Sequence, residues 1–183
     1  MTTSTAPHPA DVADATLTHA WTVLEAVPDP EIPVVSIREL GILRDVRRGA
    51  DGALEVVITP TYSGCPAMSQ IAEDIGRALD AAQLAPYRIA TVLAPPWTTD
   101  WITADAREKL RSYGIAPPTG NCASTAQPRE QVLRFVPRAL PAPSCPRCGS
   151  AHTERLAQFG STACKALYRC LDCREPFDYF KPY

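Results

Sequence analysis

The sequence lacks the features of a targeting or membrane-spanning segment. The first Lys or Arg is Arg38, so no basic region precedes an apolar stretch near Met1. No apolar run approaches the ~20 residues that a membrane helix needs. We therefore expect a cytoplasmic protein that does not bind membranes. In that compartment its seven cysteines are expected to be metal ligands or reactive thiols rather than disulfides.

Signatures of several enzyme classes are also missing. The three histidines, His8, His19 and His152, form neither an HExxH nor an ExxH motif, so the chain lacks the sets that zinc peptidases and di-iron bundles use. No Walker loop, GxGxxG or GxSxG motif is present. The formal net charge of -2 argues against general nucleic-acid binding. We therefore expect a protein without catalytic residues and without a nucleic-acid partner.

The apolar pattern predicts short helices and strands in a first domain, followed by a small ribbon. Residues 1–10 are expected to be disordered. Residues 11–136 form the first domain, with helices at 11–27, from Cys65-Pro66 to about 83, and at 103–113. Strands are expected at 42–47, 54–59, 87–93 and 131–136. Three prolines in residues 137–143 predict a stiff linker, and residues 144–183 form the ribbon.

Two CxxC pairs provide the strongest chemical signal. Each CxxC turn directs two thiolates at one centre, so two such turns close a tetrahedron around one ion. The predicted ligands are Cys145, Cys148, Cys170 and Cys173, and the closed four-thiolate set favours structural zinc. A rubredoxin-like iron site, a redox dithiol and four unligated cysteines are the alternatives. Since four cysteines already complete the site, neither the nearby Cys164 nor His152 is expected to be a ligand.

Cys65 is the second chemical candidate. It follows a predicted strand and directly precedes Pro66, and proline is favoured as a first helical residue. We therefore expect Cys65 at a helix N-terminus, where the helix dipole and unpaired backbone N–H groups favour a thiolate. Two interpretations stay open, a nucleophile or transient metal ligand and a buried helix-cap residue.

Several motifs together resemble a known family. The first half contains Asp29-Pro-Glu-Ile-Pro, Gly64-Cys65-Pro66 and Pro95-Pro-Trp-Thr, and these resemble the iron–sulfur assembly domain family that includes SufT-like proteins. The second half contains Phe159-Gly-Ser-Thr-Ala-Cys and Glu175-Pro-Phe-Asp-Tyr-Phe-Lys. These runs are similar to the branch called PaaD or PaaJ, the accessory subunits of phenylacetyl-CoA epoxidase.

The resemblance implies an α+β fold, with a small mixed α/β domain followed by a β zinc ribbon. It also implies an accessory role in phenylacetate degradation, not an enzyme. Such a protein assists assembly of an iron–sulfur cluster or its transfer to the reductase subunit of the epoxidase. The family's functional residues fall on Cys65, Asp29 and Glu31, as candidate ligands of a transient iron or cluster. The expected partners are the epoxidase subunits, especially the iron–sulfur reductase, and the iron–sulfur assembly machinery. The alternative is a structural or docking subunit in which Cys65 is buried.

The ligand count bears on the oligomeric state. Iron–sulfur clusters usually take four protein ligands, and one cysteine supplies only one. A homodimer, or one chain together with its client, would therefore have to share the cluster, and shared weak binding suits transfer.

Overall fold

The computed structural model describes residues 9–119 and 142–182, with side chains described from residue 15. The predicted strand at 131–136, Cys122 and most of the predicted linker lie outside these residues. The chain divides into two compact units, Met1–Trp97 and Thr98–Tyr183. Helices and strands alternate in the first unit and a β ribbon ends the second, which confirms the predicted α+β class. Within the described residues, no helix is both long and apolar enough to cross a membrane.

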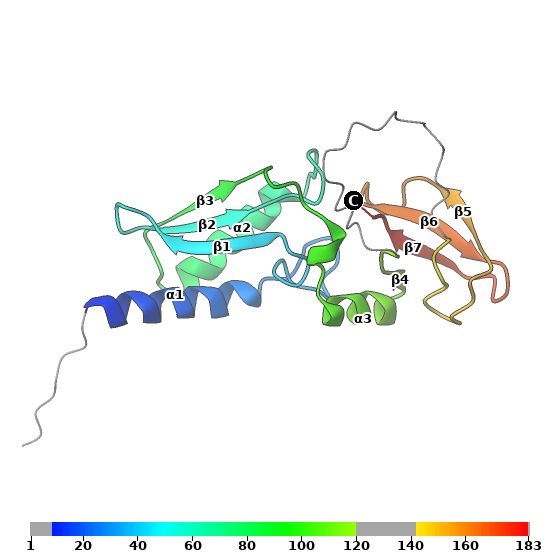
Figure 1. Ribbon diagram of the computed structural model, residues 1–183, viewed down its shortest axis with the longest axis horizontal. Helices are drawn as coiled ribbons and strands as arrows, with labels where there is room; N and C mark the ends of the chain where they lie inside the picture. Colours follow the sequence, from blue (N-terminus) through cyan, green and yellow to red (C-terminus); the bar gives the residue numbers. More distant parts are fainter. Residues whose placement is uncertain (1–8, 120–141, 183) are drawn as a thin grey trace, which may run out of the picture. The chain divides into compact units, whose positions relative to one another are not determined.

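The first unit is a three-stranded sheet with two helices. In chain order its elements are α1 (Pro9–Glu25), β1 (Leu43–Arg48), β2 (Leu54–Ile58), α2 (Met68–Ala81) and β3 (Tyr87–Thr91). β1 and β2 form an antiparallel hairpin, and α2 crosses over to bring β3 parallel to β2. Both helices lie on the same side of the sheet (Figure 1). The predicted hairpin is confirmed, and Gly52 supplies the positive φ of 81° that its turn requires.

The core of this unit lies between the sheet and the helices. α2 buries one apolar side, formed by Ile71, Ile75 and Leu79. They are completely or almost completely removed from solvent, as are Val56 and Ile58 of β2. Burial of one such aliphatic side chain contributes roughly 1.5–3 kcal/mol. The amphipathic period of 3.6 residues therefore fixes which side of α2 faces the sheet.

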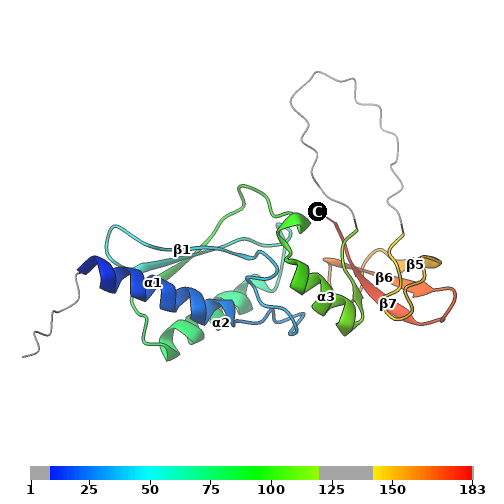
Figure 2. The ribbon, with the colours of Figure 1, turned by 60° about the horizontal axis from the view of Figure 1, so that its bottom comes forward.

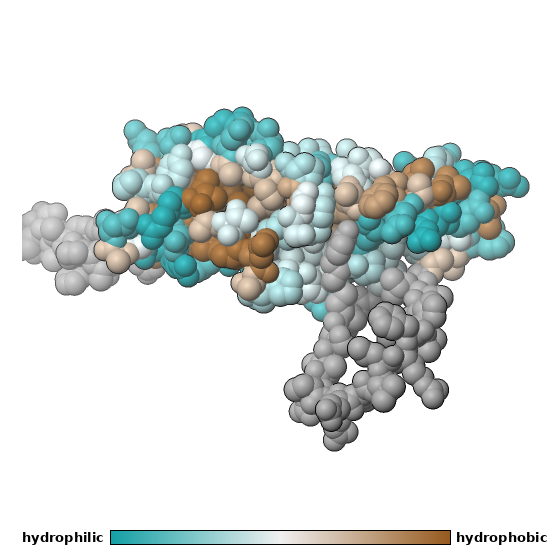
Figure 3. All heavy atoms as spheres, turned by 90° about the horizontal axis from the view of Figure 1, so that it is seen from above, coloured by the Kyte–Doolittle hydropathy of each residue, from teal (hydrophilic) through white to brown (hydrophobic). Residues whose placement is uncertain are grey.

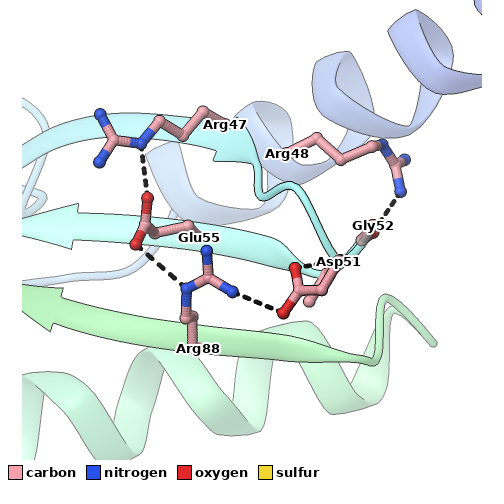
Figure 4. Close-up of polar contacts among 7 residues, drawn as sticks. Arg47, Arg48, Asp51, Gly52, Glu55 and Arg88 are labelled. Carbon is pink, nitrogen blue, oxygen red and sulfur yellow. Dashed lines mark hydrogen bonds and ion pairs between the residues drawn. The ribbon is translucent and has the colours of Figure 1, made fainter.

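The helix-free face of the sheet carries a network of charges (Figure 4). Glu55 lies opposite Arg47 on β1 and Arg88 on β3 in the strand register, and both guanidinium groups donate to its carboxylate. Arg88 also donates to Asp51 at 2.8 Å. Hydrogen bonds from Arg47 and then Arg88 lower the pKa of Glu55. Such exposed pairs contribute little to stability individually.

The second unit combines α3 with the strands of the ribbon sheet (Figure 2). Its elements are the 3-10 helix η1 (Thr99–Trp101), α3 (Ala104–Tyr113), β4 (Ile115–Ala116), β5 (Thr153–Ala157), β6 (Lys165–Cys170) and β7 (Pro176–Phe180). The sheet order is β4-β7-β6-β5. The predicted ends of α3 are confirmed: Thr103 caps it by accepting from Ala106 N at 3.1 Å, and Gly114 ends it with a φ of 95°.

One strand of the second unit was not predicted. β4 is only two residues long, and it pairs in parallel with Asp178 and Tyr179 of β7. This pairing places α3 and β4 in the same compact unit as the ribbon strands. The contact division therefore falls between Trp97 and Thr98, whereas the linker at 137–143 stays a prediction.

Candidate metal centre and the Cys65 segment

The four predicted ribbon cysteines lie together. The sulfurs of Cys145 and Cys173 are 3.7 Å apart, and those of Cys148 and Cys170 are 3.6 Å apart. All four sulfurs lie within 4.8 Å of one another. A tetrahedron with metal–sulfur bonds of about 2.3 Å has edges of about 3.8 Å, so the arrangement fits one four-coordinate ion. Disulfide sulfurs would be about 2.05 Å apart, which excludes disulfides among them.

The two knuckles repeat the same backbone pattern. Cys145 N donates to Ser150 O at 2.8 Å, and Cys170 N donates to Glu175 O at 3.0 Å. Each pair spans five residues, and each knuckle is followed by a residue with positive φ, 76° at Gly149 and 66° at Arg174. Gly149 adopts this conformation without strain, as the sequence predicted. The local chain therefore points each pair of thiols at a common centre.

The pKa values of Cys170 and Cys173 are shifted in opposite directions. The backbone N–H groups of Cys173 and Asp172, the former 3.5 Å from the Cys170 sulfur, lower the pKa of Cys170 to about 7. The backbone N–H of Glu175 favours the Cys173 thiolate, but desolvation and the neighbouring sulfurs outweigh it and raise the pKa of Cys173 to about 12. The surroundings therefore favour a thiolate at Cys170 and disfavour one at Cys173. A cation supplies the positive charge that allows all four to deprotonate.

A hydrogen-bonded brace joins the two knuckles and was not foreseen from the sequence. The Asp172 carboxylate, within the second knuckle, accepts from the Ser150 hydroxyl and lies 3.4 Å from His152 Nδ1. Ser150 Oγ also accepts from His152 N at 2.9 Å, and Leu171 N donates to His152 O at 2.8 Å. His152 is not among the residues whose candidate ligand atoms lie within 4.8 Å of one another. Spacing alone does not reveal this brace, because it depends on how the knuckles face each other.

Cys65 lies in a turn that precedes α2. The predicted helix start at Cys65-Pro66 is wrong: α2 begins at Met68 with Ala67 as its N-cap. Cys65 N instead donates to Tyr62 O at 3.2 Å, and Pro66 has no N–H to extend this bonding. Cys65 is half-buried, whereas Gly64 and Pro66 beside it are exposed. The thiol is therefore carried by a surface turn rather than by the helix itself.

The turn that carries Asp29 and Glu31 is held by a buried carboxylate. Asp29 is buried, and its Oδ1 accepts from Glu31 N at 2.9 Å and Ile32 N at 2.8 Å. Asp29 N in turn donates to Val35 O at 2.9 Å. This carboxylate fixes the turn that carries the half-buried Glu31. Among the described residues, only the four ribbon cysteines form a close group of three or more candidate metal ligands, so Cys65, Asp29 and Glu31 do not form one.

A buried hydroxyl lies in the segment between β2 and Cys65. Thr59 is 1% exposed, and its Oγ1 has no hydrogen-bond partner among the described residues. Leaving such a group unsatisfied costs roughly 1–3 kcal/mol. Thr59 directly follows β2, and nothing in the structure explains why a hydroxyl stands there.

Comparison with protein families divides the chain in two. Residues 18–93 match the family described as "Iron-sulfur cluster assembly protein", and residues 130–181 match the "PaaD zinc beta ribbon domain". A solved structure titled as a domain of unknown function, DUF59, from Bacillus anthracis is 29% identical with a TM-score of 0.50, and the match covers 55% of this chain and 96% of that one. The protein thus joins an iron–sulfur-assembly-type domain to a zinc-ribbon-type domain.

Two relatives show to which family the chain belongs. A protein of Escherichia coli (strain K12), named as one subunit of a "Putative 1,2-phenylacetyl-CoA epoxidase", is 46% identical over 94% of this chain and 96% of its own length. The Bacillus subtilis (strain 168) "Fe-S protein maturation auxiliary factor YitW" is 35% identical over 48% of this chain and 85% of its own length. The chain belongs to the PaaD family.

Proposed function

We propose that this protein is a non-catalytic accessory factor of the phenylacetyl-CoA epoxidase system that assists assembly or transfer of an iron–sulfur cluster to the reductase subunit. The observation that carries the proposal is the 46% identity across both domains to the relative named as an epoxidase subunit. The match of the first unit to maturation factors supplies the cluster-related part.

The proposed contact with the cargo is the Cys65 sulfur. Cys65 is half-buried in an exposed turn, so an incoming iron reaches it without unfolding the first unit. The transfer is a ligand exchange: the Cys65 thiolate leaves iron as a client thiolate binds, and no net oxidation occurs. One thiolate per chain holds a cluster weakly, because clusters usually take four protein ligands.

The acidic residues have separate proposed roles. Asp29 positions the turn through its two backbone hydrogen bonds, and this leaves Glu31 as the nearer candidate for contact with iron or a partner. The burial of Asp29 favours the positioning role over direct coordination.

The second unit would hold one zinc ion through Cys145, Cys148, Cys170 and Cys173. Zinc has no redox chemistry and supplies a fixed tetrahedral crosslink. Four thiolates also accept iron, and the closed four-thiolate set favours zinc. With its coordination shell filled, the ribbon would dock the protein to the epoxidase rather than carry the cluster.

Anaerobic purification tests this division of roles. Wild-type protein and Cys65→Ser are expected to contain about one zinc each. After reconstitution with iron and sulfide, only the wild type should transfer a cluster to the apo-reductase. Equal transfer by both proteins would remove Cys65 from the function. Equal failure would favour the alternative, a structural or docking subunit.

A further inference from the structure

The ribbon exposes two large apolar side chains close together in the sequence. In the described residues, the exposed large apolar side chains are Leu93, Tyr113, Leu156 and Phe159. Leu156 is 47% exposed and Phe159 is 61% exposed. They lie at the end of β5 and in the loop of residues 158–164, here called the Phe159 loop. Apolar residues lie among hydrophilic ones on this unit (Figure 3).

A bulge accounts for the exposure of Leu156. The pairing of β5 with β6 shifts between Arg155 and Ala157, which face Tyr168 and Leu167. Leu156 is therefore the extra residue of the bulge. Bulges change the direction of a side chain and also stop an edge strand from pairing with another strand. β5 is an edge strand, so a partner would meet side chains here rather than the backbone.

The Phe159 loop is held at both ends by backbone hydrogen bonds. Gly160 N donates to Lys165 O at 2.9 Å, and Lys181 N donates to Cys164 O at 3.0 Å. Lys181 Nζ also donates to Gln158 O at 3.3 Å. The loop therefore has a defined path along the end of the sheet, although its aromatic side chain faces solvent.

The charge pair between the buried Lys165 and Asp178 supports the Phe159 loop. Lys165 is 3% exposed, and its Nζ lies 4.0 Å from Asp178 Oδ2. The same oxygen accepts from Ser161 Oγ of the loop at 2.8 Å. A Cβ at position 160 would lie 2.4 Å from Asp178 Oδ1, so a larger residue there would require the Asp178 carboxylate to move. The loop is therefore preorganised, and the exposure of Phe159 does not result from a loose chain.

Cations accompany the apolar side chains. Lys181 Nζ lies 4.5 Å from the centroid of the Phe159 ring, a cation–π geometry that fixes the ring. Arg155, next to Leu156, is exposed. The surface thus combines an apolar anchor with positive charge. Residues 144–183 carry four acidic side chains beside six Lys or Arg, a balance that favours a protein partner over a phosphate backbone.

We propose that Leu156 and Phe159 form a docking surface for a protein partner that presents an apolar pocket edged by carboxylates. We infer the partner's carboxylates from the position of Lys181. A partner that covers the Phe159 ring removes water from the Lys181 ammonium group, and a negatively charged group of the partner must replace that water. A preorganised loop avoids the ordering cost of binding, and aromatic side chains are common among residues that dominate interface energy. The inference rests on the proposed function, which makes the partner a subunit of the epoxidase system.

Binding of the full-length protein to purified epoxidase complex and to purified reductase tests the proposal. Phe159→Ala and Leu156→Ser are expected to raise Kd by about tenfold or more. Tyr113→Ala is the matched control, because Tyr113 is 53% exposed in the same unit but lies on α3, and its Kd should equal the wild-type value. Lys181→Gln should reduce the dependence of Kd on salt. Unchanged zinc content would show that the variants keep a folded ribbon.

The outcomes separate the two proposals. Wild-type binding that Phe159→Ala and Leu156→Ser leave unchanged overturns the docking surface and leaves the proposed function standing. Failure of the wild type to bind either preparation overturns the proposed function, and the docking surface with it. Self-association that Phe159→Ala abolishes, or binding of a single-stranded oligonucleotide that it abolishes, overturns the assignment to an epoxidase subunit.

Discussion

Variants of Asp29 can show whether its carboxylate positions the turn or binds a metal ion. Its Oδ1 accepts from two backbone N–H groups, at 2.9 Å and 2.8 Å, and the residue is 6% exposed. Asp29→Ala leaves both groups without this acceptor. Since each unsatisfied buried donor costs roughly 1–3 kcal/mol, we expect a loss of about 2–4 kcal/mol in the free energy of unfolding. Asp29→Asn keeps an oxygen in place and should lose about 1 kcal/mol or less.

Urea denaturation of the two variants measures this difference, and cluster transfer measures the functional consequence. If Asp29 only positions the turn, Asp29→Asn should transfer clusters nearly as well as the wild type. An Asn variant that is stable but inactive would identify the carboxylate as a ligand. An Ala variant as stable as the wild type would refute the reasoning from the two hydrogen bonds.

Three further predictions concern the ribbon and the charged sheet face. Elemental analysis should find about one zinc in the wild type and none in Cys170→Ser, whose ribbon should unfold while the first unit keeps its own unfolding transition; retained zinc would contradict the ligand assignment. Asp172→Ala should release zinc to a chelator about 10–100-fold faster, whereas Arg169→Ala, which removes an exposed pair on the same sheet, should not. Because the folded-state pKa of Glu55 is lowered, its ionisation stabilises the fold above its ordinary value of 4.5, and this contribution is lost as pH falls through the folded-state pKa. Glu55→Gln should therefore flatten the loss of stability between about pH 5 and pH 2; a slope equal to that of the wild type would contradict this.

Local patterns were sufficient for much of the fold and for the ribbon site. The burial of Ile75 on α2, the cap at Thr103 and the CxxC turn of each knuckle each depend on residues within a few positions of one another. Such short-range relations are readable from one sequence, because helical period, capping and the CxxC turn have fixed spacing.

Features that depend on distant parts of the chain were not predicted. β4 is a strand only because β7, about sixty residues later, offers it two partners. The Asp172 brace needs the second knuckle to face Ser150. The start of α2 was misjudged because Pro66 is compatible both with a first helical residue and with the preceding turn.

The measurement that tests the central claim most directly is the cluster content of the reductase in cells that lack this protein. Iron and acid-labile sulfide would be determined in reductase purified anaerobically from deletion cells, and from the same cells complemented with the wild type or with Cys65→Ser. The account predicts cluster-poor reductase in deletion cells and in the Cys65→Ser strain, and restoration by the wild type. Full cluster occupancy of the reductase in the deletion cells would contradict the loading role.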